Sequence, residues 1–237
     1  MDKEAILIRE RFRGLPDSGN GGYVCGLVAQ MIGEAAQVTL RRPPPIGRPL
    51  AVRRSEDGAL AILDGAEVVA EGVSADVEVE VPEPVGFRDA IEAARRYRGF
   101  ALHPFPMCFV CGPERDEGDG LRIFPGPVAG RRIVAAPWTP DQTLGGADGR
   151  VRPEFLWAAL DCPGAFANGF PEIPMVLGRL AARGMQAVEP GEECVVIGWS
   201  AGTEGRKHFA GTALFGNNGA LRAVARATWI RLIRAVS

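Results

Sequence analysis

The stretch SGNGGYVCGLVAQMIG, from Ser18 to Gly33, decides how this chain folds. Apolar residues recur along it at helical spacing, which predicts a helix over 22–36. Asn20 is a residue type that caps helices, while Gly21 and Gly22 leave the first turn without side chains. The first N–H groups of any helix lack partners within it and carry partial positive charge. These backbone amides are therefore candidates to bind a negatively charged or polarised oxygen.

The whole chain has the composition of an ordinary globular protein. Its 237 residues are 46% hydrophobic and 24% charged, enough for one large domain or two small ones. A net charge of −2 without a basic run argues against nucleic acid as a partner. No apolar run is long enough to span a membrane, and the charged N-terminus lacks a signal-peptide core. We therefore expect a cytoplasmic protein with reduced cysteines.

The residues around the first helix predict strands in an α+β arrangement. Residues 4–12 predict a strand before the helix, and residues 37–82 predict several antiparallel strands separated by turn signals. The alternation is clearest in ADVEVEV, residues 75–81. Strand, helix and then a run of strands is an α+β order. A second amphipathic helix is expected over 87–100, which we interpret as a surface connector.

The same order of elements occurs again from residue 121 onward. A strand segment, a helix within RVRPEFLWAALDCPG (150–164) and a run of strands follow one another. Setting Leu27 against Ala159 aligns the two helices, and Asp64–Glu71 aligns with Asn218–Ala225 at a larger offset. Such a repeat predicts two copies of one unit. The expected divisions are an N-terminal domain at 1–85, a connecting helix and linker at 86–107, and a C-terminal domain at 108–237.

Three motifs resemble the hotdog-fold acyl-CoA thioesterases, in which a curved antiparallel sheet wraps a central helix and two units pair. The Gly21-Gly22 helix start resembles the His-Gly-Gly start of phenylacetyl-CoA thioesterase-like proteins. CFVCGPERDEGDGLRI, from Cys108 to Ile123, is similar to the segment before the first strand in that group. Asp161 lies about two turns into its helix, like the Asp of the family's active helix. With the repeat, the resemblance covers nearly the whole chain and implies a tandem, or double, hotdog of the α+β class.

A comparison of the two copies indicates that each keeps half of the family's functional set. The first helix has Ala29 at the position where the second helix has Asp161. The second helix begins Arg152-Pro153-Glu154, and Pro153 has no N–H to donate. The resemblance implies that the helix-start amides of one hotdog face the helix carboxylate of the other. One composite site per chain is therefore expected.

The resemblance implies hydrolysis of a thioester at that composite site. The amides of Gly21 and Gly22 would polarise the thioester carbonyl, and Asn20 would assist or position the loop. Asp161 would act as general base for water or as nucleophile through an anhydride, and both roles stay open. The expected partner is acyl-CoA or another acyl thioester, and no cofactor, nucleic acid or membrane is expected. The length of the acyl chain stays open, and so does the question of whether the chain forms a homodimer. The residues expected to bind substrate are Tyr23, Glu154 and Trp157.

Each of these residues also has a purely structural interpretation. Asn20 could be a plain helix cap, Asp161 could bond backbone amides where its helix ends, and Glu154 could complement the helix dipole. Asn20 also replaces the family's His, and an Asn cannot usefully take up a proton at neutral pH. This departure leaves open an alternative function, a non-hydrolytic hotdog protein that binds acyl-CoA or acyl carrier protein. A hydratase is disfavoured because neither His103 nor His208 lies at a helix start.

The pair Cys108-x-x-Cys111 is the remaining motif with chemical potential. His103 lies five residues before it, but structural zinc commonly needs two spaced ligand pairs, and no second pair exists. We therefore predict no metal, and a redox pair is disfavoured for similar reasons. The five cysteines are interpreted as small buried residues.

Overall fold

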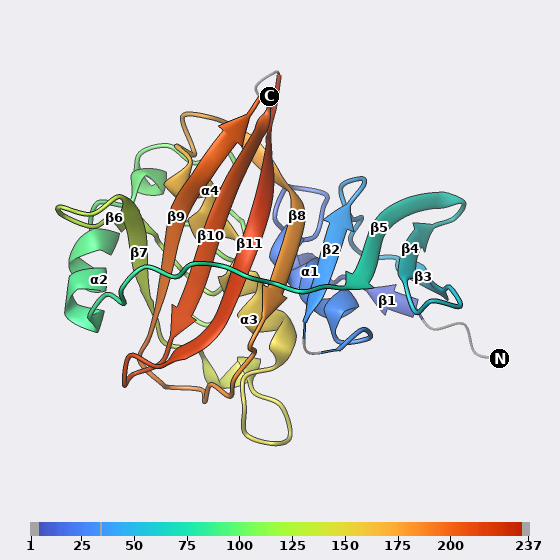
Figure 1. Ribbon diagram of the computed structural model, residues 1–237, viewed down its shortest axis with the longest axis horizontal. Helices are drawn as coiled ribbons and strands as arrows, with labels where there is room; N and C mark the ends of the chain where they lie inside the picture. Colours follow the sequence, from blue (N-terminus) through green and yellow to red (C-terminus); the bar gives the residue numbers. More distant parts are fainter. Residues whose placement is uncertain (1–4, 34, 234–237) are drawn as a thin grey trace.

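The computed structural model describes residues 5–33 and 35–233, and a single curved antiparallel sheet dominates them (Figure 1). Eleven strands make up this sheet within the described part of the chain, which confirms the predicted α+β class. The helices are α1 (Gly21–Ala29), α2 (Phe87–Ala94), α3 (Pro153–Ala159) and α4 (Cys162–Ala167). The strands are β1 (Ala5–Leu7), β2 (Ala36–Leu40), β3 (Pro49–Arg54), β4 (Leu60–Asp64), β5 (Glu67–Ser74), β6 (Gly126–Pro127), β7 (Ile133–Trp138), β8 (Met175–Arg183), β9 (Cys194–Glu204), β10 (Lys207–Phe215) and β11 (Leu221–Arg231).

The strand order of the sheet repeats. The first half runs β1-β3-β4-β5-β2 and the second runs β7-β9-β10-β11-β8, with β6 on the outer edge of β7. In the first half α1 lies between β1 and β2 in the chain, and in the second half α3 and α4 lie between β7 and β8. The two halves therefore share one connectivity. The halves join through antiparallel pairing of β2 with β8, where Ala36 lies opposite Ala182. The repeat of elements that the sequence predicts is thus matched by a repeat in the order of strand pairing.

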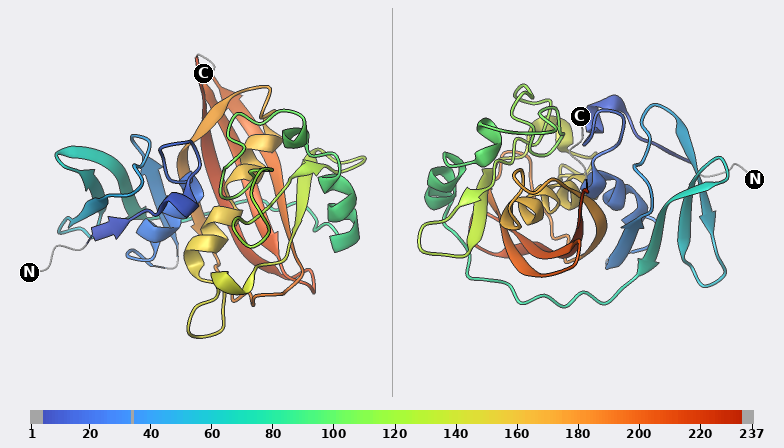
Figure 2. Two further views of the ribbon diagram at one scale, coloured as in Figure 1. Left: turned by 180° about the vertical axis from the view of Figure 1, so that it is seen from behind. Right: turned by 90° about the horizontal axis from the view of Figure 1, so that it is seen from above.

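The helices α1, α3 and α4 lie inside the curve of the sheet, and α1 packs directly on α3 (Figure 2). Two glycines of α1 permit this close approach. A Cβ atom added at Gly22 would lie 2.5 Å from Asp161 Cβ, and one added at Gly26 would lie 2.6 Å from Glu154 Cα. Both separations are shorter than atoms tolerate, so only glycine fits at either position. The packing brings the start of α1 against the end of α3.

An aromatic cluster fills the core beside this helix pair. The Tyr23 ring stacks on Phe12 with centroids 4.2 Å apart and lies 5.8 Å from the Phe155 ring. Phe109 meets Phe12 edge to face at 5.0 Å. These rings come from both halves and from the segment between them, so the larger of two hydrophobic clusters joins the two halves.

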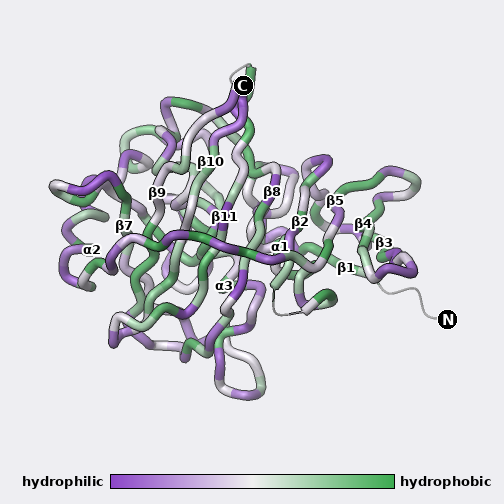
Figure 3. Tube along the Cα trace, viewed as in Figure 1, coloured by the Kyte–Doolittle hydropathy of each residue, from purple (hydrophilic) through white to green (hydrophobic). Residues whose placement is uncertain are grey.

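The predicted strand over 75–81 is wrong, because residues 75–86 pair with no strand. They form an extended segment that crosses the face of the sheet opposite to α3 and α4, with both apolar and polar stretches (Figures 1 and 3). Val77 is buried and Val79 packs against the sheet, whereas Glu78 and Glu80 are exposed. The alternation of valines and acidic residues therefore arises because one side of an extended segment is buried, and not because the segment pairs with a strand.

Other element bounds are shorter than predicted. The helix expected over 22–36 ends at Ala29, where i→i+3 bonds such as Met31 N to Val28 O tighten the chain toward β2. The strand expected over 4–12 ends at Leu7, and the helix expected over 87–100 ends at Ala94. Among the helices that the structure describes, none is both long enough and apolar enough to cross a membrane.

Candidate functional site

A buried carboxylate, Asp161, lies between α3 and α4 and is held by residues of the other half. Its side chain is 2% exposed. Its Oδ2 accepts hydrogen bonds from Asn20 Nδ2 at 2.8 Å and from the Gly22 amide at 2.9 Å. Its Oδ1 is also buried and has no hydrogen-bond partner among the described residues. The carboxylate is therefore fixed through one oxygen, and the other oxygen keeps its accepting capacity.

Asn20 combines the two roles considered for it. Its Oδ1 caps α1 by accepting from the Tyr23 amide at 2.9 Å, while its Nδ2 donates to Asp161. The cap fixes which end of the side-chain amide faces the carboxylate. Asn20 thus orients Asp161 without exchanging a proton.

Burial controls the ionisation of Asp161. Removal from water raises the pKa of this carboxyl from 3.8 to about 7, although the hydrogen bonds from Gly22 and Asn20 favour the charged form. The neighbouring Cys108 adds to the upward shift of the pKa. A carboxyl group with a pKa near neutrality can hold or release a proton at physiological pH, which suits general-base chemistry.

A cavity of about 270 Å³ lies beside Asp161. Asn20, Gly21 and Asp161 line its polar end, and the exposed Arg41 and Arg42 line its rim. Most of the remaining wall is apolar, which is typical of a site for a small molecule with a hydrocarbon portion. The large apolar residues of the wall are Leu15, Leu40, Phe105, Phe166, Phe170, Met175, Val176, Leu177, Trp229 and Ile230.

The two helix-start glycines differ in what they offer. The Gly22 amide already donates to Asp161, so it is engaged in holding the carboxylate. The Gly21 amide donates to no acceptor among the described residues, and Gly21 lines the cavity. A Cβ atom at Gly21 would meet the side chains of Leu177 at 2.8 Å and Leu40 at 3.2 Å, both in the cavity wall. The absence of a side chain at Gly21 therefore lets the helix start lie directly against this part of the cavity wall.

The three residues expected to bind substrate lie outside the walls of this cavity. Tyr23 belongs to the aromatic cluster, and Trp157 is 2% exposed within the core. Glu154 is buried at the opposite end of the helix pair, where Gln30 Nε2 donates to its Oε2 at 3.1 Å. The sequence places these three residues on the two predicted helices, but it does not distinguish the core from the cavity wall.

The opposite end of the helix pair is the repeat-related counterpart of the Asp161 end. By the helix alignment Glu154 stands where the first copy has Gly22, and Ala29 stands where the second has Asp161. Glu154 fills its position with a side chain and accepts from Gln30, while Arg152 Nε lies 3.5 Å from Glu154 Oε1. A backbone amide at a helix start therefore donates to a carboxylate at the Asp161 end of the helix pair, whereas Gln30 donates to the carboxylate at the Glu154 end.

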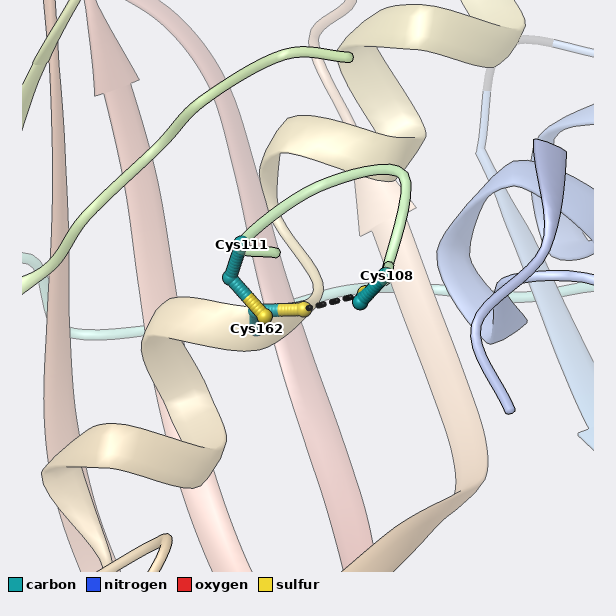
Figure 4. Close-up of side chains that lie close together, drawn as sticks. All are labelled: Cys108, Cys111 and Cys162. Carbon is teal, nitrogen blue, oxygen red and sulfur yellow. Dashed lines mark hydrogen bonds between the residues drawn. The ribbon is translucent and has the colours of Figure 1, made fainter. Parts of the chain in front are cut away.

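Folding brings a third cysteine to the pair that the sequence singled out (Figure 4). The sulfurs of Cys108, Cys111 and Cys162 lie within 4.8 Å of one another, and all three residues are buried. Hydrogen bonds from the Cys111 and Cys162 thiols hold the pKa of Cys108 well below its usual range. Sequence reasoning missed this cluster because Cys162 lies 54 residues beyond Cys108 and shows no spaced partner.

His103 also lines the cavity, although both of its ring nitrogens are occupied. Its Nδ1 accepts from the Phe105 amide at 3.0 Å, and its Nε2 lies 3.3 Å from Cys111 Sγ. Neither nitrogen is free to act as a base toward a ligand in the cavity.

Solved structures resemble this chain over nearly its full length. A putative thioesterase II from Thermobifida fusca YX superposes with a TM-score of 0.63 at 14% identity, covering 98% of this chain and 93% of that one. An acyl-CoA thioesterase II, TesB2, from Mycobacterium marinum gives 0.60 at 15% identity, covering 98% and 92%. A hot dog fold protein from Alicyclobacillus acidocaldarius gives 0.59 at 11% identity, covering 97% and 93%. No protein-family model matches the chain, and no curated protein matches its sequence. These likenesses show that the chain has the hotdog fold, as the motif resemblance implied.

Proposed function

We propose that this chain is an acyl-CoA thioesterase with one hydrolytic site between two hotdog units. The observation that supports it best is the buried Asp161, clamped by Asn20 and the Gly22 amide at the wall of an apolar cavity. The repeated strand order supports the tandem arrangement. The proposed divisions are a hotdog at 1–85, a connecting helix and linker at 86–107, and a hotdog at 108–237.

In the proposed reaction Asp161 acts as the general base. Its Oδ1 takes a proton from water, and the resulting hydroxide attacks the thioester carbonyl carbon. The carbon–sulfur bond then breaks, releasing a carboxylic acid and the CoA thiolate, and the thiolate takes up the proton that Asp161 Oδ1 accepted, which restores the carboxylate. A thiol has a pKa of roughly 8.5 and can leave as thiolate, so the base is the main catalytic requirement. Asn20 and Gly22 act by fixing the direction of the carboxylate.

Negative charge that develops on the carbonyl oxygen requires a donor. We assign this role to the Gly21 amide, which lacks an acceptor among the described residues and belongs to the cavity wall. A backbone N–H at a helix start suits a developing oxyanion because the dipole and the geometry are set before the reaction begins. Gly22, first expected to share this role, instead holds the base.

The rest of the cavity suits the two ends of an acyl-CoA. Apolar side chains such as Leu177, Met175 and Phe166 would surround the acyl chain, which gains free energy by leaving water. Arg41 and Arg42 at the rim would lie near the phosphates of the CoA moiety. Their present partners, Glu71 and Glu67, lie on exposed surface, where such ion pairs contribute little and exchange easily.

The test compares two buried carboxylates on one helix pair. Asp161→Asn should lower kcat for acyl-CoA hydrolysis by about 10²–10⁴-fold, because an amide cannot accept the proton. Glu154→Gln is the matched control: it removes the other buried carboxylate, away from the cavity, and should keep turnover near wild type. Hydrolysis is followed as thiol release over a panel of acyl chain lengths, with thermal unfolding of each variant. Unchanged turnover in Asp161→Asn would refute the assignment of Asp161 as the base. If the wild-type chain binds acyl-CoA but does not hydrolyse it, the non-hydrolytic alternative is favoured.

A further inference from the structure

The three-cysteine cluster beside Asp161 has no part in the proposed hydrolysis. We propose that Cys108, Cys111 and Cys162 bind one zinc ion as a three-thiolate site whose fourth position opens onto the cavity. The sequence prediction of no metal depended on the absence of a second ligand pair. Folding supplies the third ligand from the start of α4, next to the proposed base.

The spacing of the sulfurs is that of a tetrahedral zinc site. Zinc–sulfur bonds of about 2.3 Å at tetrahedral angles place neighbouring sulfurs about 3.8 Å apart. Cys108 Sγ and Cys162 Sγ lie 3.9 Å apart, and all three sulfurs lie within 4.8 Å of one another. Small side-chain rotations would therefore bring the three thiolates to bonding distance.

The kind of ligand selects the ion. The three ligands are sulfurs, and the described residues add no histidine, aspartate or glutamate to the group within the same distance. Soft thiolates favour zinc or cuprous copper over magnesium, calcium and manganese, which prefer oxygen. Zinc is the proposed ion because it is the usual partner of a Cys-x-x-Cys pair joined by a further cysteine.

His103 supports the sulfurs from outside the proposed site. Its Nδ1 accepts from the Phe105 amide, so the proton of the neutral ring lies on Nε2. Nε2–H then points at Cys111 Sγ, 3.3 Å away, and Asn20 Nδ2 lies 3.8 Å from Cys108 Sγ. Donors of this kind stabilise the negative charge of metal-bound thiolates and fix their direction. His103 is thus a positioning residue and not a fourth ligand.

The cavity provides both access and the fourth position. Cys108, Cys111 and Cys162 all line it, so an ion can reach the sulfurs without the core opening. With three protein ligands, the remaining position would be filled by water or by a small ligand in the cavity, as in zinc sites that keep an exchangeable position. The ion would also cross-link the loop of Cys108 to α4, and thereby stiffen the wall around Asp161.

Metal binding is measured on the full chain, reduced and stripped with chelator. We expect one zinc per chain by elemental analysis after reloading. Titration with Co²⁺ should give visible d–d bands and a near-ultraviolet thiolate-to-cobalt band that saturate at one equivalent. Cys108→Ser, Cys111→Ser and Cys162→Ser should each lose the thiolate-to-cobalt band at one equivalent. Cys194→Ser is the matched control, because Cys194 is a buried free cysteine in β9, outside the cluster.

The measurement does not depend on hydrolysis, so failure of the zinc site and failure of the thioesterase proposal are distinguishable. His103→Phe should keep one ion per chain but weaken its affinity by about 10–100-fold, the usual effect of removing an outer-sphere donor. Reduced, folded wild-type chain that takes up neither zinc nor cobalt would overturn the proposal, whatever the variants do. Equal loss of the cobalt spectrum in Cys194→Ser would overturn it as well.

Discussion

The contact between Gly22 and Asp161 allows a sharp test of how the site is built. Gly22→Ala places a methyl group 2.5 Å from Asp161 Cβ and 2.8 Å from the Trp157 carbonyl oxygen. Gly26→Ala makes the same change one turn later, 2.6 Å from Glu154 Cα. Both variants overpack the same pair of helices, but only Gly22→Ala does so at the carboxylate.

The expected cost in stability follows from these distances. Overpacking a core costs about 1–3 kcal/mol, and here backbone atoms oppose the methyl group, so side-chain rotation cannot relieve the clash. Replacing Gly by Ala within a helix returns about 1 kcal/mol at most. Because backbone atoms oppose the methyl group, the upper part of that range, about 2–3 kcal/mol, applies, and subtracting about 1 kcal/mol leaves a net loss of about 1–2 kcal/mol for each variant. This loss lowers Tm by about 2–8 °C in a chain of this size.

The effect on turnover should separate the two variants. A displacement of about 1 Å between α1 and Asp161 would misdirect the base and lower kcat by about 10²-fold in Gly22→Ala. Gly26→Ala should retain most of its activity, because its clash lies at the Glu154 end. Thermal unfolding and acyl-CoA hydrolysis are measured on both variants. Wild-type stability in Gly22→Ala, or an equal loss of kcat in Gly26→Ala, would refute the reasoning.

Further expectations concern ionisation and cavity shape. In chelated protein kcat/KM should rise with pH through about 7, because the ionised form of Asp161 is the proposed base; a flat profile would contradict that role. The folded-state pKa of Asp161 lies above its unfolded value of 3.8, so the protonated carboxyl group stabilises the folded state. This contribution to the free energy of unfolding is complete below pH 3.8 and is lost as the pH rises through about 7. Chelated Asp161→Asn should therefore gain Tm relative to wild type as pH rises across that range. Asn20→Ala removes a hydrogen bond that lowers this pKa, so it should shift the rise in kcat/KM to higher pH and reduce the plateau. Gly21→Val should raise KM more for long acyl chains than for short ones, because its side chain would meet Leu177 and Leu40 in the cavity wall; equal KM changes would contradict the placement of the acyl chain.

The meeting of the two halves could be predicted from sequence because the copies could be compared. Ala29 in place of a carboxylate, and Pro153 in place of a donor, indicated that the Gly22 end of one helix needed Asp161 from the other. The structure places them 2.9 Å apart, although the catalytic roles stay predictions. The hydrogen bond from the Gly22 amide to Asp161 could not be foreseen. An alignment of the two copies predicts which residues are neighbours, but it does not predict which atoms form hydrogen bonds.

Other parts of the site follow from packing that leaves no periodic signal. Cys108 and Cys111 lie in irregular chain, so nothing in their spacing indicated that Cys162 would join them. Tyr23 and Trp157 have the apolar character of cavity walls and of cores alike, and only packing assigned them to the core. The valines of 75–81 alternate like a strand because one side of an extended segment is buried.

The unequal ends of the α1–α3 pair have a consequence for which halves can form the site together. Neither half can build the Asp161 site by associating with a second copy of itself. Two N-terminal halves would bring together glycine helix starts with Ala29 and no carboxylate, and two C-terminal halves would bring Asp161 against Pro153 and the Glu154 side chain. The Asp161 site therefore needs one half of each kind, and a single chain that contains both supplies them in equal number.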